Sequence, residues 1–244
     1  MTWPPPSDPA KPGVDILNAY LRELTQEEMD HDREGFLHAV SGCHPNELLV
    51  CLGTGPSLAA APLELMSGVT TLGCNGIGHV YQPSYYVIAD PFIYGLHQDV
   101  FLACPGTRIL SSFTHGEYDL RLYYRREDVI GLTRDRVFSA DSTGFLLISI
   151  ACIMGASRIL LAGYDGYAPG SQRYHCYDEA EVEAHRVRYE WQPGSTKEDL
   201  LRRAFSNAAQ VAPKLGLDIS LITPSPFLGD LFSYVEPERA LGHG

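Results

Sequence analysis

The chain has 244 residues, of which 45% are hydrophobic and 20% are charged, close to the values for an average soluble globular protein. This composition excludes a fibrous or wholly disordered chain, and the length suits one α/β domain with appendages. The net charge of −12 repels polyanions, so we expect no nucleic-acid partner, although a small anion can still bind to a local set of backbone amides.

The first 46 residues precede the main predicted domain, which covers residues 47–228. Residues 1–13 contain five prolines, which lack backbone donors and favour extended chain, so we predict a disordered or surface-draped arm. In residues 14–46, apolar side chains recur at helical spacing among many acidic ones, which indicates one or two lead-in helices. Residues 229–244 form a predicted C-terminal tail.

Short apolar runs alternate with helical segments through the first half of the main domain. The predicted strands are Leu48–Leu52, Val69–Cys74, Tyr85–Ala89, Arg108–Ser111 and a segment near Asp128–Leu132. The first run is apolar throughout, which is typical of a strand buried on both faces. A helix is predicted to follow it, because Pro56 suits the first helical position and Ala59–Met66 are good helix formers.

The second half of the domain continues this alternation. Ser142 or Thr143 caps a helix that runs to Met154, and because it is apolar nearly all round we expect it to lie sandwiched inside the protein. It is followed by a strand at Arg158–Gly163, a polar insertion from Tyr164 to about Ser195, a helix at Thr196–Leu215 and a strand at Leu217–Ile222. After Thr223 we expect irregular chain with a short helical turn near Phe227–Phe232. The whole predicts a single Rossmann-like α/β domain, with an open, mostly parallel sheet and helices on both faces.

The cysteines and the N-terminus indicate a reduced setting. The six cysteines are scattered and contain no C-x-x-C pair, so we predict buried free thiols. The N-terminus lacks the basic and apolar regions of a secretory signal, and no apolar run reaches the ~20 residues that span a bilayer. We therefore expect a cytoplasmic protein without a transmembrane segment.

Polar or glycine-rich residues follow four of the predicted strands. They are Gly53–Ser57, Asn75-Gly76, Asp90-Pro91 and Gly163–Tyr167. Ligands of open parallel sheets bind beyond the carboxyl ends of the strands, so this coincidence predicts a ligand site. Gly53 and Gly55 let the backbone turn and approach a ligand, while the start of the next helix offers free amides to a phosphate. The alternative is a tight strand-to-helix turn that binds nothing.

Two features disfavour a nicotinamide dinucleotide at this edge. Leu58 replaces the third glycine of G-x-G-x-x-G, and the second strand ends in Asn75, where an acidic residue normally holds the ribose. Asn75 can instead pair with a base or a sugar. Ser142, Thr143 and Gly144 open the buried helix and form a second candidate set of phosphate donors, the alternative being a plain helix cap.

Further candidates lie at strand ends and in the polar insertion. Asp90 and Asp165 are candidate Mg²⁺ ligands, because this ion often binds one or two carboxylates together with phosphate oxygens. The alternative is that they cap helices or face water. The nine histidines show no metal-ligand pairing, so we expect no zinc site. His175 and His185 are candidate general bases, with a solvated surface role as the alternative. Four aromatic residues are expected either to line a pocket or simply to pack within the insertion: Tyr164, Tyr167, Tyr174 and Tyr177.

Together these segments resemble a known family. The motifs are Gly53–Leu58, Cys74-Asn75, Asp90-Pro91, Ser142–Gly144 before an apolar helix, Gly155 before Arg158–Gly163, and Tyr164–Tyr167. Their order and spacing are similar to those of the bacterial lipooligosaccharide sialyltransferases, and to those of the related domain in motility accessory factors and archaeal 6-hydroxymethylpterin diphosphokinases. The resemblance covers roughly Leu48 to Leu228 and implies a nucleotide-binding transferase domain.

The resemblance to the sialyltransferases implies a nucleotide-sugar-dependent glycosyltransferase with a CMP-activated acidic sugar as donor and a glycan or small molecule as acceptor. Tyr167 and Tyr174 are implied to hydrogen-bond the leaving phosphate, which removes the need for a metal. The residues assigned to the nucleotide are Gly53, Thr54, Gly55, Pro56, Ser57, Asn75, Asp90, Ser142, Thr143, Gly144 and Asp165.

Three positions depart from the family pattern. Thr54 stands where the sialyltransferases have asparagine, Asp90 stands at another asparagine position, and residues 194–196 hold no histidine where the family has its catalytic base. His185 or His175 then becomes the candidate base. Asp90 favours an alternative, a Mg²⁺-dependent diphosphokinase, and the missing histidine favours another, a nucleotide-binding module without catalysis. A homo-oligomer is also left open.

Overall fold

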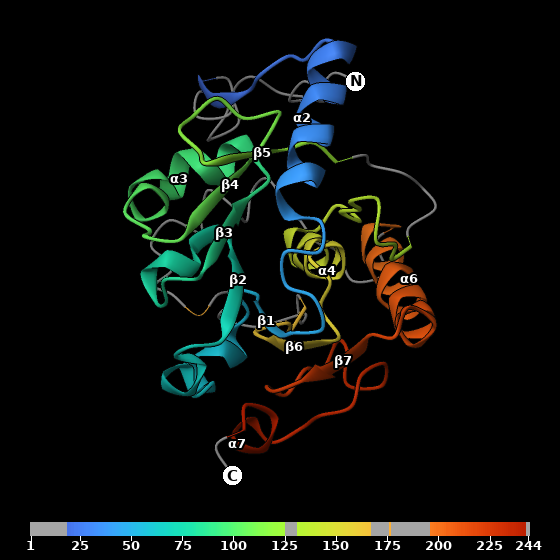
Figure 1. The fold of residues 1–244 in the computed structure, drawn as a ribbon. Coiled ribbons are helices and arrows are strands. Elements are labelled where there is room, and N and C mark those ends of the chain that lie inside the picture. The colour runs from blue at the N-terminus through green and yellow to red at the C-terminus, as the bar shows by residue number, and fades with distance from the viewer. Residues whose placement is uncertain (1–18, 125–130, 167–175, 177–195, 243–244) are drawn as a thin grey trace.

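The computed structural model describes residues 19–124, 131–166, 176 and 196–242 (Figure 1). Seven strands form one sheet in which every pair of neighbours is parallel. Across the sheet they are β5 (Leu120–Leu122), β4 (Thr107–Ser111), β3 (Tyr85–Ile88), β2 (Thr70–Cys74), β1 (Leu48–Leu52), β6 (Arg158–Ala162) and β7 (Asp218–Leu221). The predicted α/β class and open parallel sheet are confirmed.

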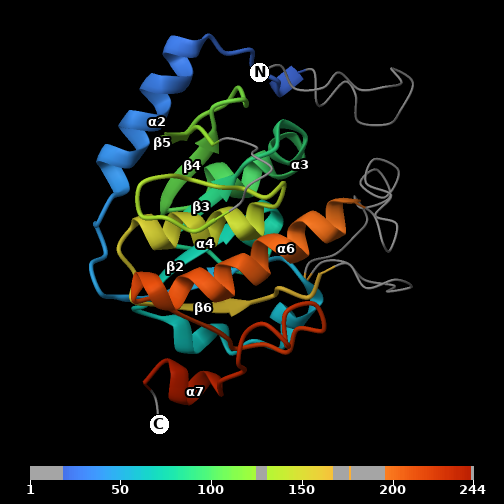
Figure 2. The ribbon, with the colours of Figure 1, turned by 90° about the vertical axis from the view of Figure 1, so that its right-hand side faces the viewer.

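Helices cover both faces of the sheet, as predicted (Figure 2). One face carries α2 (Gln26–Val40), α4 (Thr143–Ile153) and α6 (Thr196–Val211), which continues into η4 (Ala212–Leu215). The other carries α3 (Pro91–Leu102), the 3₁₀ helices η1 (Pro56–Ala60), η2 (Leu63–Met66) and η3 (Asn75–His79), and the short α7 (Pro237–Ala240). Each face therefore has an apolar core of its own.

The central helix α4 lies between the sheet and α6. All its side chains from Phe145 to Ile153 are buried. Phe145 packs edge-on against Phe205 of α6, with ring centroids 5.3 Å apart. The continuous apolar sequence of this helix predicted such a sandwiched position, and the prediction is confirmed.

The predicted lead-in segment contains α2. Thr25 caps this helix by accepting a hydrogen bond from the amide of Glu28, whose carboxylate accepts in return from the amide of Thr25 at 2.8 Å. Met29, Phe36 and Val40 form its buried face. The predicted arm at residues 1–13 lies outside the described residues.

The helix predicted after the first strand is wrong. In its place η1 and η2 are two short 3₁₀ helices, and Ala61 between them is extended, with φ −72° and ψ 138°. Ala61 precedes Pro62, and the proline ring disfavours the α conformation in the residue before it. No α-helix therefore begins at the turn after β1.

The fifth strand and the tail also differ from the prediction. β5 is formed by Leu120–Leu122, whereas Gly131 and Leu132 lie in no strand and residues 125–130 are outside the described part. The short helical turn predicted near Phe227–Phe232 is present, since the Phe232 amide donates to the Leu228 carbonyl at 3.0 Å, and beyond it the tail also contains α7, which was not predicted.

The cysteines follow the prediction with one exception. Cys43 is exposed, because it lies in the turn that links α2 to β1. The buried free thiols are Cys51, Cys74, Cys104, Cys152 and Cys176. Among the helices of the described ranges, none has the length and apolar character that crossing a bilayer requires.

The strand order places a topological switch point between β1 and β6. From β1 the chain builds the sheet outward through β2, β3, β4 and β5, and it then returns to the other side of β1 with β6 and β7. The turns after β1 and β6 therefore leave the same edge of the sheet in neighbouring positions. In open α/β sheets this edge of the switch point is where ligands bind.

Candidate functional site

The turns after β1 and β6 are joined by backbone hydrogen bonds. The amide of Gly53 donates to Ala162 and that of Gly55 to Gly163, both at 2.9 Å. A Cβ on Gly53 would lie 2.4 Å from the Gly163 carbonyl oxygen, and Gly163 itself has a φ of +73°. Glycine is therefore required here by the close approach of the two turns, whether or not a ligand binds.

Ser57, Asp165 and Thr223 form a hydrogen-bond network at the switch point. The Ser57 amide donates to Oδ2 of Asp165 at 3.1 Å, and the Ser57 hydroxyl donates to the same oxygen at 2.8 Å. Since that hydroxyl has one proton, the Thr223 hydroxyl, 3.0 Å away, supplies the hydrogen of the second contact. Thr223 also accepts from the Gly163 amide at 3.0 Å. Thr223 was not predicted as a site residue, although a polar residue close after a predicted strand is the signal that could have identified it.

The Asp165 carboxylate thus lies where an anion would meet the turn after β1. A Cβ on Gly55 would come within 2.0 Å of its Oδ2. Burial raises the pKa of Asp165, and the hydrogen bonds from Ser57 oppose this shift. The sequence predicted that amides of this turn are free for a phosphate. Those of Gly55 and Ser57 are instead bonded within the protein, so a phosphate reaches Ser57 only if Asp165 moves.

The start of α4 lies beside these two turns. The hydroxyl of the buried Tyr164 donates to the carbonyl of Gly144 at 2.9 Å, which ties the end of β6 to the helix. Ser142 caps α4 by accepting a hydrogen bond from the Phe145 amide at 3.4 Å, so this side chain acts as an ordinary helix cap. Within the described ranges the amides of Thr143 and Gly144 have no acceptor. Both amides lie at the positive end of the helix dipole, where a helix start leaves donors free for a ligand.

Backbone strain surrounds the start of α4. Ala140 and Asp141, directly before the cap, have φ values of 48° and 53°, in the left-handed region that non-glycine residues rarely adopt. Such conformations cost of order 1–3 kcal/mol each and cluster at functional sites. The hydroxyl of Ser139 in the same loop is buried and has no hydrogen-bond partner among the described residues.

Asn75 provides a second unsatisfied group at this edge. It follows β2, the neighbour of β1, and has a φ of 54°. Its backbone carbonyl accepts from the Tyr86 hydroxyl, but its side-chain Oδ1 is buried without a partner in the described part of the chain. A buried acceptor of this kind is normally paired in native proteins.

The two acidic residues considered for Mg²⁺ both have partners within the protein. Asp90 is the cap of α3 and accepts from the Phe92 amide at 2.8 Å. Asp165 bonds Ser57 as described above. In the described ranges, no three His, Cys, Asp or Glu side chains come together in a way that could hold a metal ion.

The candidate catalytic residues from the insertion lie outside the described residues: Tyr167, Tyr174, His175 and His185. After residue 166 of this insertion, Cys176 is described, and its amide donates to the Thr54 carbonyl at 2.8 Å. Residue 176 therefore contacts the turn after β1. Burial raises the pKa of the nearby Cys74 thiol to about 12, so this thiol is no nucleophile at neutral pH.

These features define a Rossmann-like α/β protein with its candidate ligand edge at the switch point. We use the term switch-point site for the turns Gly53–Ser57 and Gly163–Asp165 together with the start of α4 and Asn75. The sequence placed all four segments at strand or helix ends, and the structure brings the first three into contact.

Comparisons with known proteins give structural matches at low identity. The sialyltransferase CstII from Campylobacter jejuni, in a complex with cytidine-5′-monophosphate, is 11% identical with a TM-score of 0.49, over 78% of this chain and 85% of that chain. The monofunctional α-2,3-sialyltransferase Cst-I from Campylobacter jejuni is 12% identical with a TM-score of 0.49, over 78% and 80%. Similarity at this level carries no argument about function. No family model and no curated protein matches the sequence.

Proposed function

We propose that the protein is a glycosyltransferase that takes a CMP-activated acidic sugar as donor and serves surface glycan synthesis. The observation that carries the proposal is the convergence of the turn after β1, the turn after β6 and the start of α4 at the switch point. Nucleotides bind at this place in parallel α/β sheets. The motifs that resemble the sialyltransferases lie in the same segments.

The donor phosphate is assigned to the start of α4. The amides of Thr143 and Gly144 are unbonded in the described structure and lie at the positive end of an 11-residue helix. The Ser57 amide is taken by Asp165, so α4 supplies the free donors. The strained residues Ala140 and Asp141 hold the chain in the conformation that leads into this helix start.

The nucleoside is assigned to the β1–β2 side of the site. The buried Oδ1 of Asn75 lacks a donor, and an amino group of the base or a ribose hydroxyl would satisfy it. Thr54 and Pro56 lie in the turn after β1, the strand next to β2, and would border the ligand.

The reaction in this scheme is cleavage of the sugar–phosphate bond. Negative charge develops on the departing phosphate, and the amide donors of α4 stabilise it without a metal ion. A base takes the proton of the acceptor hydroxyl as this oxygen attacks the sugar. Tyr167 and Tyr174 as further phosphate donors, and His175 or His185 as the base, are proposals from the sequence.

Thermal shift measurements with CMP, CDP, UDP and ATP, each with and without Mg²⁺, test the proposal. CMP is expected to raise the melting temperature without Mg²⁺, because a ligand that binds only the folded state stabilises it. Stabilisation by ATP that requires Mg²⁺ would contradict the proposal in favour of a diphosphokinase. If CMP binds but radiolabelled CMP-sialic acid is neither hydrolysed nor transferred, the protein is a binding module.

A further inference from the structure

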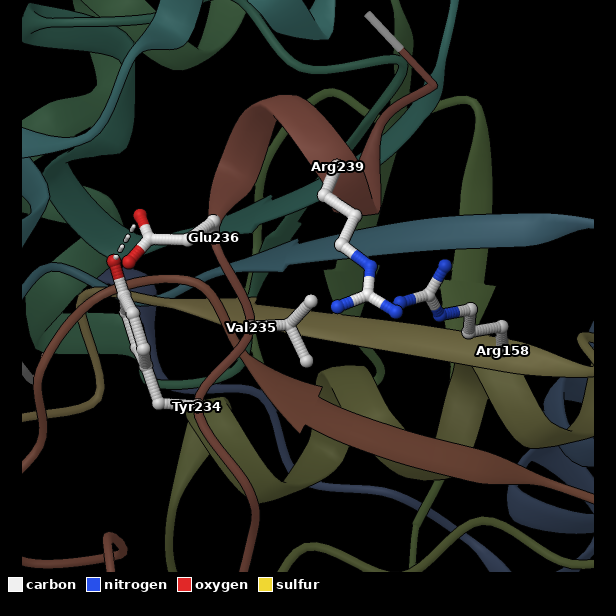
Figure 3. A pocket seen from close by; sticks show the side chains of 5 residues that line it. All are labelled: Arg158, Tyr234, Val235, Glu236 and Arg239. Atoms are coloured by element: carbon white, nitrogen blue, oxygen red, sulfur yellow. Dashed lines mark hydrogen bonds between the residues drawn. The ribbon is translucent and has the colours of Figure 1, made fainter. Parts of the chain in front are cut away.

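A pocket of about 510 Å³ lies away from the switch-point site, on the face of the sheet that carries α7. Its lining residues are Arg158, Tyr234, Val235, Glu236 and Arg239 (Figure 3). Arg158 is the first residue of β6, so four residues of strand, roughly 13 Å, separate it from the carboxyl end of β6. The pocket is therefore independent of the candidate nucleotide site.

Two guanidinium groups converge in this pocket. Figure 3 shows the side chains of Arg158 and Arg239 pointing toward one another from β6 and α7. Arg158 donates to the carbonyl of Ala240 at 3.2 Å, and its buried Nε forms no hydrogen bond within the described part of the chain. Arg239 is exposed and forms no ion pair with the described residues.

Nearby acidic groups compensate only part of this positive charge. Asp218 lies 3.5 Å from Nε of Arg158, but its side chain is 63% exposed to water. The Glu236 carboxylate lies on the other side of the pocket, where it accepts from the Tyr234 hydroxyl at 3.3 Å. Among the five side chains that line the pocket, Glu236 is the acidic one, and Figure 3 shows its carboxylate apart from the two guanidinium groups.

We propose that this pocket binds a small phosphate monoester through Arg158 and Arg239. Two converging guanidinium groups repel each other, and an anion that bridges them replaces this repulsion by charge-assisted hydrogen bonds. The planar donor fork of arginine matches phosphate oxygens, and a monoester dianion matches two positive charges. The volume exceeds that of a phosphate group, which leaves room for an organic part beside Val235 and the Tyr234 ring.

The test is a calorimetric titration of the protein with inorganic phosphate and with glycerol 3-phosphate, both at constant ionic strength. Arg239→Gln removes one donor fork at an exposed position, and Arg203→Gln removes an exposed guanidinium of α6 as the matched control. We expect saturable binding that Arg239→Gln weakens about tenfold, as for the loss of a hydrogen bond between charged groups, and that Arg203→Gln changes less than twofold.

Three results would overturn the proposal. They are phosphate binding that does not saturate, equal affinities of the Arg239→Gln and Arg203→Gln variants, and acetate competing as well as phosphate. CMP binding is measured with the same variants. Because the pocket lies apart from the switch-point site, Arg239→Gln is expected to leave CMP affinity unchanged, which separates the failure of one site from that of the other.

Discussion

The Asp165 carboxylate accepts hydrogen bonds from both the amide and the hydroxyl of Ser57, at 3.1 and 2.8 Å. The turn after β1 is therefore shaped to hold an anion, and in this structure the anion belongs to the protein. Burial raises the pKa of Asp165, which means that its charged form is less favourable there than in water. A phosphate close to Ser57 would have to compete with this carboxylate.

Removal of the Asp165 charge should strengthen nucleotide binding. Asp165→Asn keeps the shape of the side chain but ends the repulsion of a nearby phosphate. We expect CMP to bind about fivefold more tightly, since like charges about 4 Å apart in water repel by about 1 kcal/mol. Calorimetry measures the affinity, with Asp135→Asn as the control for loss of an exposed charge. Weaker CMP binding by Asp165→Asn would mean that the carboxylate itself contacts the ligand or a metal.

Stability should depend on pH through the same residue. Because the pKa of Asp165 is raised by folding, the folded protein holds this proton more tightly than the unfolded chain. Its stabilising contribution is complete below the unfolded-state pKa and is lost as the pH rises through the higher folded-state value. We therefore expect the free energy of unfolding of the wild type to fall relative to that of Asp165→Asn as the pH rises from acid to neutral values. Urea denaturation across this range measures it, and a constant difference would speak against the prediction.

Two glycine substitutions should have opposite effects on stability, because Gly53 lies in the contact between the turns after β1 and β6 and Gly35 lies in open space on α2. Gly53→Ala places a Cβ 2.4 Å from the Gly163 carbonyl oxygen, so the backbone must shift, and we expect a loss of about 2 kcal/mol or more. Gly35→Ala in α2 meets no atom within 4 Å and should stabilise by about 0.5–1 kcal/mol. Denaturant midpoints of both variants decide this. Equal stability of Gly53→Ala and the wild type would show that the two turns do not pack as described.

Elements with a strong local pattern could be predicted from the sequence, and those set by distant contacts could not. The apolar run of β1 and the nearly continuous apolar sequence of α4 were found for this reason. β5 was misplaced because Arg121 interrupts its apolar pattern. The guanidinium of Arg121 donates to the Ser111 carbonyl at 3.0 Å. The residues next to Arg121 in the sequence give no pattern from which this contact could be predicted.

The candidate site was predicted as a set of segments rather than as contacts. Polar residues after strands identified Ser57 and Asp165 separately. Their hydrogen bond joins residues 108 positions apart and depends on β1 and β6 being neighbours in the sheet, which no local pattern encodes. The prediction that the Ser57 amide is free for a phosphate was wrong for this reason, because this amide donates to Asp165. The amides at the start of α4, in contrast, have no acceptor among the described residues.

The most direct test of the account is the affinity of CMP for Thr143→Pro and Thr143→Ala. Proline removes one amide donor at the first position of α4, where it fits a helix, and the extended Ser142 before it, with φ −138° and ψ 124°, tolerates a following proline. Alanine removes the side chain but keeps the amide. If α4 binds the nucleotide phosphate, Thr143→Pro weakens CMP binding about tenfold and leaves cytidine binding unchanged, while Thr143→Ala stays close to the wild type. Wild-type CMP affinity in Thr143→Pro would contradict the account.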